Sequence, residues 1–206
     1  MADRIVVGYL GDRESLAQTV RASAACGLDV VAVAFDLGGR TALTALRDDA
    51  LTLGAIRCHA LDVREEFARD VIVPALAAVP GDLHAVVTEA AERFVGRSLA
   101  SIATLEAATF VEPGRIDLPW RTRIDRRDVP GTAIIKLRFA HDTPVELNGI
   151  TMTPAEILES LETITGQPAL DVLHTAYQDL PGSPDGIVEL AVADGRVDVM
   201  SRLVAS

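Results

Sequence analysis

The stretch Arg4-Ile5-Val6-Val7-Gly8-Tyr9-Leu10-Gly11-Asp12-Arg13-Glu14-Ser15 is an apolar run that breaks at glycine and acid and then enters a helical pattern. This order predicts a first strand, a tight turn and a first helix. In nucleotide-binding α/β domains such a turn lies at the carboxyl end of the strand, where backbone N–H groups and the helix dipole can hold a phosphate. The turn is therefore the first candidate for a ligand site.

The residues of this turn favour two opposite interpretations. Small residues and hydroxyls let the backbone approach an anion closely, and Gly11 and Ser15 meet that requirement. Asp12 and Glu14 stand at the cap and in the first helical turn, where carboxylates accept from the N–H groups that a phosphate needs. Arg13 could pair with a phosphate, although an exposed arginine there is usually solvated. We expect the turn to cap its helix and to repel a phosphate.

Apolar strands alternate with helical patterns over residues 1–112, which we predict to be one domain. The strands are expected at 5–10, 30–35 and 56–61. The helices are expected at 16–27, 41–53 and 64–79. This alternation predicts an α/β fold in which a parallel sheet is covered by helices on both faces.

The end of this domain and the segment after it are less regular. Residues 83–94 could form a helix or a strand, with a helix favoured from Thr88, and 97–108 are predicted to be a second helix. A short strand is expected at 109–111. Residues 113–131 are rich in proline, glycine and arginine, which is typical of a linker.

Residues 132–206 are predicted to form a small α+β domain. Two antiparallel hairpins are expected, at 133–139 with 144–149 and at 187–193 with 196–203, the second around Asp194-Gly195. Between them, Thr153-Pro154-Ala155-Glu156 has the hydroxyl, proline and glutamate of a capping box, which predicts a helix that ends at Gly166.

Composition excludes several classes of function. The net charge of −11 over 206 residues argues against nucleic-acid binding, and no apolar run approaches the length of a membrane span. Cys26 and Cys58 lack metal-ligand spacing and are expected to be buried free thiols, while the four histidines show no metal-binding pattern. We expect no metal, no membrane contact and a cytoplasmic location.

Two separated blocks of sequence resemble argininosuccinate synthase, the ATP-dependent ligase that joins citrulline and aspartate. The first block consists of residues 4–9, 30–38, 51–55, 62–67 and 74–76. The second block is Pro144-Val145-Glu146-Leu147-Asn148-Gly149 with the helical residues 154–166. The resemblance implies an adenine-nucleotide α-hydrolase-like, Rossmann-like domain at the N-terminus, joined to part of the synthase domain.

The resemblance also implies site residues, several of them altered. The family's pyrophosphate loop, Ser-Gly-Gly-Leu-Asp-Thr-Ser, falls on residues 10–16, so the nucleotide-binding candidates here are Tyr9, Gly11, Arg13 and Ser15. The small residue beside the adenine falls on Phe35, whose ring could fill the space of the base.

A citrulline-side segment of the family falls on residues 93–102, where Gly96 and Ser98 are the amino-acid-binding candidates. The family's Lys-Gly-Asn-Asp-Gln segment has no counterpart between Ala108 and Thr132.

Three hypotheses follow. The first, which we favour, is a shortened non-catalytic relative with a binding, regulatory or assembly role and no cofactor. The second is an active ligase of the same type that uses ATP with magnesium at a rewired site. The third is a sensor that binds an amino acid or a nucleotide without turning it over.

Self-association is also expected, because the resemblance implies a homo-oligomeric family whose second domain carries subunit contacts. Independently, the hairpin 187–204 carries more apolar residues than a small domain can obviously cover. The alternative is that this hairpin folds back on the sheet of the first domain.

Overall fold

The computed structural model describes residues 3–38, 42–78, 82–113, 116, 133–180, 185–193 and 196–204. The predicted linker 113–131 lies outside the described residues except for Pro113 and Ile116, as does the Asp194-Gly195 turn. Contacts divide the chain into two units, Met1–Arg64 with Thr88–Leu118 and Glu65–Val87 with Pro119–Ser206. Residues 65–87 thus group with the C-terminal unit, and the domain boundary at 112 stays a prediction.

The first unit is built on a parallel four-stranded sheet with the order β3-β2-β1-β4. Its strands are β1 (Asp3–Tyr9), β2 (Leu28–Asp36), β3 (Arg57–Asp62) and β4 (Thr109–Phe110). Strand β2 is buried along most of its length, which explains its continuous apolar sequence. The predicted α/β fold and the parallel pairing of the first three strands are confirmed.

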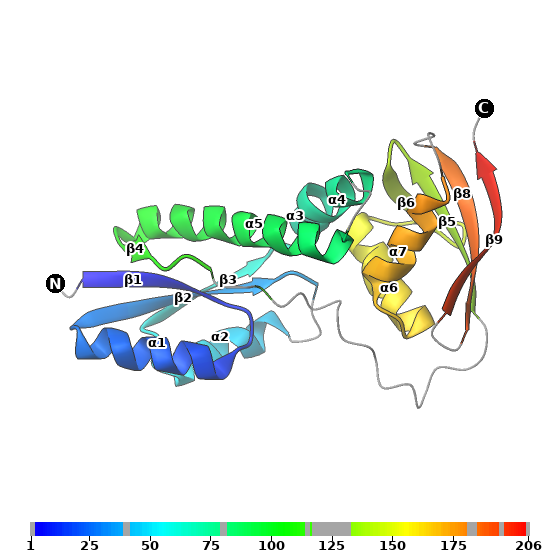
Figure 1. Cartoon of the computed structure of the whole chain (residues 1–206). Helices are drawn as coiled ribbons and strands as arrows, with labels where there is room; N and C mark the ends of the chain where they lie inside the picture. The colour runs from blue at the N-terminus through cyan, green and yellow to red at the C-terminus, as the bar shows by residue number, and fades with distance from the viewer. Residues whose placement is uncertain are drawn as a thin grey trace. The chain divides into compact units, whose positions relative to one another are not determined.

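Helices cover both faces of this sheet (Figure 1). The helices α1 (Arg13–Ala25) and α2 (Leu43–Thr52) lie on one face, where Leu16 and Leu46 share a core cluster with Val7 and Tyr9. On the opposite face is α5 (Leu83–Glu106), which brings Leu99 close to Gly8. The side chains of β1 therefore alternate between two separate apolar layers.

The helix α5 corrects one prediction. We expected a break between residues 94 and 97, but one helix runs through both segments. Glycine inside a helix costs about 1 kcal/mol relative to alanine, which weakens the sequence signal without ending the helix. A Cβ at Gly96 would lie 3.7 Å from Glu112 Oε2, an ordinary van der Waals contact, so the segment after β4 runs beside α5 at this residue.

The predicted helix 64–79 is also corrected. It consists of α3 (Arg64–Phe67), a π-helical segment η1 (Ala68–Ile72) and α4 (Val73–Ala77). Pro74 lacks the N–H that an α-helix would donate to the carbonyl of Asp70, which favours the wider turn.

The second unit contains an antiparallel five-stranded sheet with the order β7-β6-β5-β8-β9. Its strands are β5 (Ala133–Ala140), β6 (Thr143–Leu147), β7 (Ile150–Thr151), β8 (Gly186–Ala193) and β9 (Arg196–Val204). Both predicted hairpins are confirmed. His141 and Asp142 turn the first hairpin at φ values of 50° and 62°, and Asp142 accepts a 2.7 Å hydrogen bond from the Tyr177 hydroxyl. Burial, followed by this bond, raises the pKa of Tyr177 to about 12.

The helices α6 (Pro154–Thr165) and α7 (Ala169–Gln178) also belong to this unit. The first was predicted with its capping box and its left-handed Gly166. The second was missed, although Leu170, Leu173 and Ala176 recur at helical spacing and are all buried.

The capping box of α6 gives a stability prediction. Thr153 Oγ1 accepts from the Glu156 N–H at 3.3 Å, and Glu156 Oε2 accepts from the Thr153 N–H at 2.8 Å. We expect Thr153→Ala to lower the free energy of unfolding by about 1 kcal/mol in urea denaturation. The matched control is Thr163→Ala, an exposed threonine in the same helix, for which a change below about 0.5 kcal/mol is expected. Equal losses in the two variants would contradict a role for the cap.

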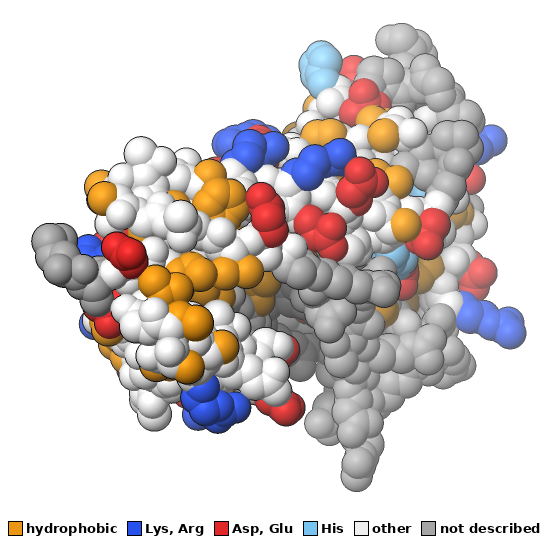
Figure 2. All heavy atoms as spheres, turned by 60° about the vertical axis from the view of Figure 1, so that its left-hand side comes forward, with side chains coloured by type: hydrophobic (Ala, Val, Ile, Leu, Met, Phe, Trp, Pro, Cys, Tyr) orange, Lys and Arg blue, Asp and Glu red, His pale blue; other side chains and the backbone are white. Residues whose placement is uncertain are grey.

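The described surface carries charges of both signs. On the face drawn in Figure 2, basic side chains are interspersed with acidic ones. Among the described residues, no helix is both long enough and apolar enough to cross a membrane. The predicted burial of both thiols is wrong for Cys26, which is exposed, while Cys58 is half-buried, and both are free.

Candidate functional site: a cavity beside the first strand

A cavity of about 450 Å³ lies beside β1, where the order of the sheet reverses. The chain moves outward from β1 to β2 and β3, and then returns to place β4 on the other side of β1. Open α/β sheets bind ligands at the carboxyl ends of strands at such a reversal. The volume falls within the roughly 300–1,000 Å³ of small-molecule sites. The lining residues are Val7, Gly8, Tyr9, Leu10, Asp12, Ser15, Leu16, Thr19, Val95, Val111, Glu112, Pro113 and Ile116.

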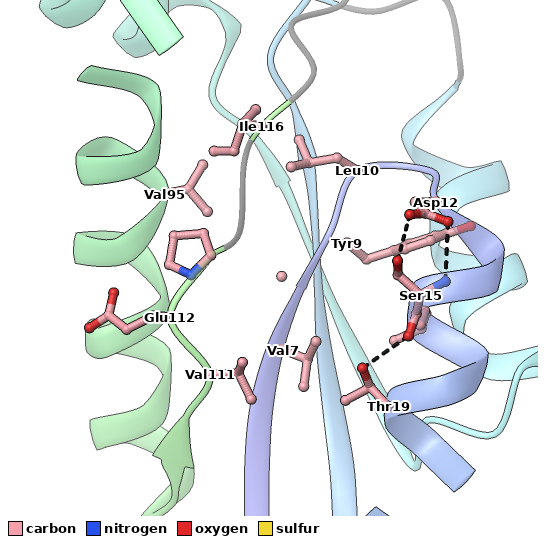
Figure 3. Close-up of a pocket in the computed structure, with 13 residues that line it drawn as sticks. Val7, Tyr9, Leu10, Asp12, Ser15, Thr19, Val95, Val111, Glu112 and Ile116 are labelled. Atoms are coloured by element: carbon pink, nitrogen blue, oxygen red, sulfur yellow. Dashed lines mark hydrogen bonds between the residues drawn. The ribbon is translucent and has the colours of Figure 1, made fainter. Parts of the chain in front are cut away.

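The cavity exists because β1 and β4 separate. Val111 N donates to Val6 O at 2.9 Å, as in a continuing parallel ladder. The next donor, to the carbonyl of Gly8, would come two residues later at Pro113, which has no N–H. The edge of β1 therefore opens between Gly8 and Pro113. Figure 3 shows Val95 and Val111 on one side of β1 and Ser15 and Thr19, from α1, on the other.

Asp12 occupies the N-terminus of α1. Its Oδ1 accepts from the backbone N–H groups of Glu14 and Ser15, each at 3.1 Å, and its Oδ2 accepts from Ser15 Oγ at 2.6 Å. These hydrogen bonds, above all those from Ser15, lower the pKa of Asp12. The carboxylate is therefore ionised and holds two of the N–H groups that a phosphate would need. Glu14 does not share this role, because its carboxylate accepts from Gln18 Nε2 at 3.3 Å.

Other residues of the turn and the end of β1 also have roles outside the cavity. Arg13 Nη1 forms an ion pair with Asp49 Oδ1 on α2, and neither residue lines the cavity. Burial, followed by the negative charge of Asp49, raises the pKa of the Tyr9 phenol. Gly11 has a φ of 108°, a conformation that L side chains rarely adopt, so it serves the tight turn.

The nucleotide-binding candidates thus divide into two groups. Tyr9 and Ser15 line the cavity, whereas Gly11 and Arg13 belong to the adjoining turn. Phe35 does not line it: this residue is buried, and its ring lies near Gly8 on the α5 face of the sheet.

The amino-acid-binding candidates are both on α5. Gly96 lies beside Glu112 and Pro113 at the margin of the cavity. Ser98 does not line the cavity, and its hydroxyl donates to the carbonyl of Phe94 at 3.3 Å.

Sequence reasoning missed much of the lining, including Thr19, Val95, Val111, Glu112, Pro113 and Ile116. A proline soon after a short predicted strand could have indicated that the ladder opens there. The sequence alone does not show that this strand returns to the side of β1.

A second cluster, also missed, surrounds the buried carboxylate of Glu106 at the end of α5. Its Oε1 lies 2.7 Å from Arg57 Nη1 and 2.8 Å from His59 Nε2, and its Oε2 lies 3.1 Å from Arg4 Nη1. The cluster ties α5 to the first residues of β1 and β3. Among the described residues, no group of histidine, cysteine and acidic side chains could hold a metal ion.

The N-terminal part of the chain matches a known family. Residues 4–116 match the family model described as the arginosuccinate synthase N-terminal HUP domain. Argininosuccinate synthase from Dehalococcoides mccartyi is 30% identical over 116 residues, which cover 55% of this chain and 29% of that protein. The argininosuccinate synthases of Streptococcus suis and Streptococcus thermophilus are 35% identical over 88 residues, 42% of this chain and 22% of each of those proteins.

The matched part spans less than a third of the length of these curated relatives. Because the family model ends at residue 116, the resemblance of residues 144–166 to the synthase domain stays a prediction.

Proposed function

Since the chain belongs to the arginosuccinate synthase N-terminal HUP domain family, we propose that it is a non-catalytic relative that binds a small molecule without using ATP. The ligand occupies the cavity beside β1, and the chain has a binding or regulatory role in the cytoplasm. No cofactor takes part.

The observation that carries this proposal is the carboxylate of Asp12 on the N–H groups of Glu14 and Ser15. A helix N-terminus holds a phosphate through these N–H donors and through its dipole. An ionised aspartate at the cap accepts hydrogen bonds from the same donors and is stabilised by the same dipole. A triphosphate would have to displace the cap and approach a negative charge. The absence of a Lys-Gly-Asn-Asp-Gln segment between Ala108 and Thr132 supports the same reading.

An activity assay with calorimetry tests this proposal. The protein is incubated with ATP, magnesium, citrulline and aspartate, and argininosuccinate is measured, while ATP, AMP, citrulline and aspartate are titrated separately. We expect no product and no saturable ATP binding. Product formation would favour the ligase alternative, in which Arg13 leaves Asp49 to meet a phosphate. Micromolar binding of AMP, citrulline or aspartate without turnover would identify the bound small molecule as a nucleotide or an amino acid, as in the sensor hypothesis.

We also propose self-association through β9, on narrower grounds than the sequence suggested. Three apolar residues of the second hairpin, Val188, Leu190 and Val192, are buried within the unit. The exposed large apolar side chains of the described hairpin are Ile187 at 36% on β8 and, on the edge strand β9, Met200 at 58% and Leu203 at 70%. Pairing two copies about a two-fold axis would cover both the edge and these side chains.

Sedimentation of the purified protein at micromolar concentration tests the self-association. We expect a dimer or larger species in the wild type and dissociation in Leu203→Lys, because a buried, unpaired lysine opposes the contact. The matched control is Ile134→Lys on the interior strand β5, an equally apolar residue with 56% of its surface exposed, which should leave the assembly intact. A wild-type monomer at the chain mass of 21.9 kDa would contradict the proposal.

A further inference from the structure

The α1 wall of the cavity offers hydrogen-bond acceptors but no free side-chain donors. A hydroxyl has a single proton, and both hydroxyls of this wall have already used theirs. Ser15 Oγ donates to Asp12 Oδ2 at 2.6 Å, and Thr19 Oγ1 donates to the carbonyl of Ser15 at 2.9 Å. Their lone pairs remain, together with those of the Asp12 carboxylate. A ligand that satisfies this wall must itself carry N–H or O–H groups.

The facing strand edge adds another acceptor. Gly8 lines the cavity with backbone atoms alone, and its carbonyl has no ladder donor at Pro113. Gly8 and the α1 residues line the same cavity, so both favour a donor-bearing ligand.

The charges of the lining residues also favour a ligand that carries hydrogen-bond donors. The described lining residues include the carboxylates of Asp12 and Glu112 and contain no lysine, arginine or histidine. Figure 3 shows the Glu112 carboxylate directed toward α5 rather than into the centre, so it contributes charge at the margin. The remaining walls are mostly apolar. They are formed by Val7, Leu10, Leu16, Val95, Val111 and Ile116.

We propose that this cavity binds a small organic cation, an amine or amidine whose N–H groups meet Asp12, Ser15 and Gly8 while an apolar body fills the rest. The proposal rests on the proposed function, because it identifies the ligand class of the same cavity. Anions such as carboxylates and phosphates are disfavoured there, since they bring neither a donor nor a complementary charge.

Three probes of the same shape test the charge requirement: benzamidine, benzamide and benzoate. Each is titrated into the full chain by calorimetry at low salt. We expect benzamidine to bind at least about tenfold more tightly than benzoate, with benzamide between them, and the difference to shrink in about 1 M salt. Equal affinities, a preference for benzoate, or no binding by any of the three probes would overturn the proposal.

The variant Asp12→Asn tests whether the Asp12 carboxylate causes the preference for benzamidine over benzoate. Asparagine is also a good helix cap, so the variant should remain folded while losing the charge. We expect it to lose most of the preference for benzamidine, whereas Asp48→Asn, an exposed acid on α2 outside the cavity, should keep it. An unchanged preference in Asp12→Asn would contradict the assignment.

The outcomes separate this inference from the proposed function. Argininosuccinate formation would end the proposed function whatever the probes do. A preference for benzoate in a protein that neither binds ATP nor forms product would overturn the ligand class alone.

Discussion

Asp12→Asn is expected to bind ATP at least about tenfold more tightly than the wild type, which should bind it more weakly than about 1 mM. The Asp12 carboxylate holds the N–H groups of Glu14 and Ser15 and carries the charge nearest to any phosphate placed there. Asparagine keeps an acceptor for the helix cap but removes the repulsion, and a neutral cap is more easily displaced by an anion.

Titration of ATP by calorimetry at constant ionic strength measures this change. Asp48→Asn alters the net charge by the same amount on the exposed surface of α2 and should leave ATP affinity within about twofold of the wild type. Together with the benzamidine titration, one substitution is then expected to shift two ligands in opposite directions. If Asp12→Asn bound both ATP and benzamidine more tightly than the wild type, or bound neither more tightly, the charge of Asp12 would not control the site.

Glu106→Ala is expected to lower the free energy of unfolding by about 2–3 kcal/mol at neutral pH. The Glu106 side chain is only 3% exposed and accepts from Arg4, Arg57 and His59. Removing it leaves two arginines without their carboxylate. Because both are partly exposed and can be hydrated, the loss should lie below that of a fully buried pair.

Urea denaturation followed by circular dichroism measures this loss. Glu89→Ala removes a glutamate from the same helix, but one whose partner, Arg93, is an exposed residue four positions away. We expect that control to cost about 0.5 kcal/mol or less. If the two alanine variants were equally stable, the Glu106 cluster would not be holding α5 to the sheet.

The same carboxylate should make stability depend on pH. The hydrogen bonds with His59 and Arg57 lower the pKa of Glu106 from its ordinary value of 4.5. A carboxyl group whose pKa is lowered by folding stabilises the protein above that ordinary value, and its contribution disappears as the pH falls below it. Between about pH 5 and about pH 3, the wild type should therefore lose more stability than Glu106→Gln, which cannot titrate.

The first three strands and the two hairpins were predictable because their patterns are local. Strand β2 is a continuous apolar run because both its faces are buried, and the β5–β6 hairpin alternates because only one of its faces is. The helix α7 and the continuity of α5 were missed for opposite reasons. In the first case a short helix lay between stronger signals, and in the second the segments 83–94 and 97–108 were predicted separately, although one helix runs through both.

The site was only partly predictable. Asp12 could be predicted as a helix cap because the cap and its N–H partners lie within three residues. The cavity could not, since its walls come from β1, α1, α5 and residues 111–113 and 116, which only the return of β4 brings together. The Glu106 cluster was the hardest part to predict, because the carboxylate of Glu106 accepts a hydrogen bond from Arg4, which is 102 residues away in the sequence.

The most direct test of the central claim follows the two N–H groups that Asp12 occupies. In ¹⁵N-labelled wild-type protein, the amide resonances of Glu14 and Ser15 are recorded while ATP with magnesium is added to about 5 mM. If the carboxylate excludes the phosphate, these resonances stay in place, and they move on ATP addition only in Asp12→Asn. Saturable shifts of both amides in the wild type at micromolar ATP would contradict the claim that this turn no longer holds a nucleotide.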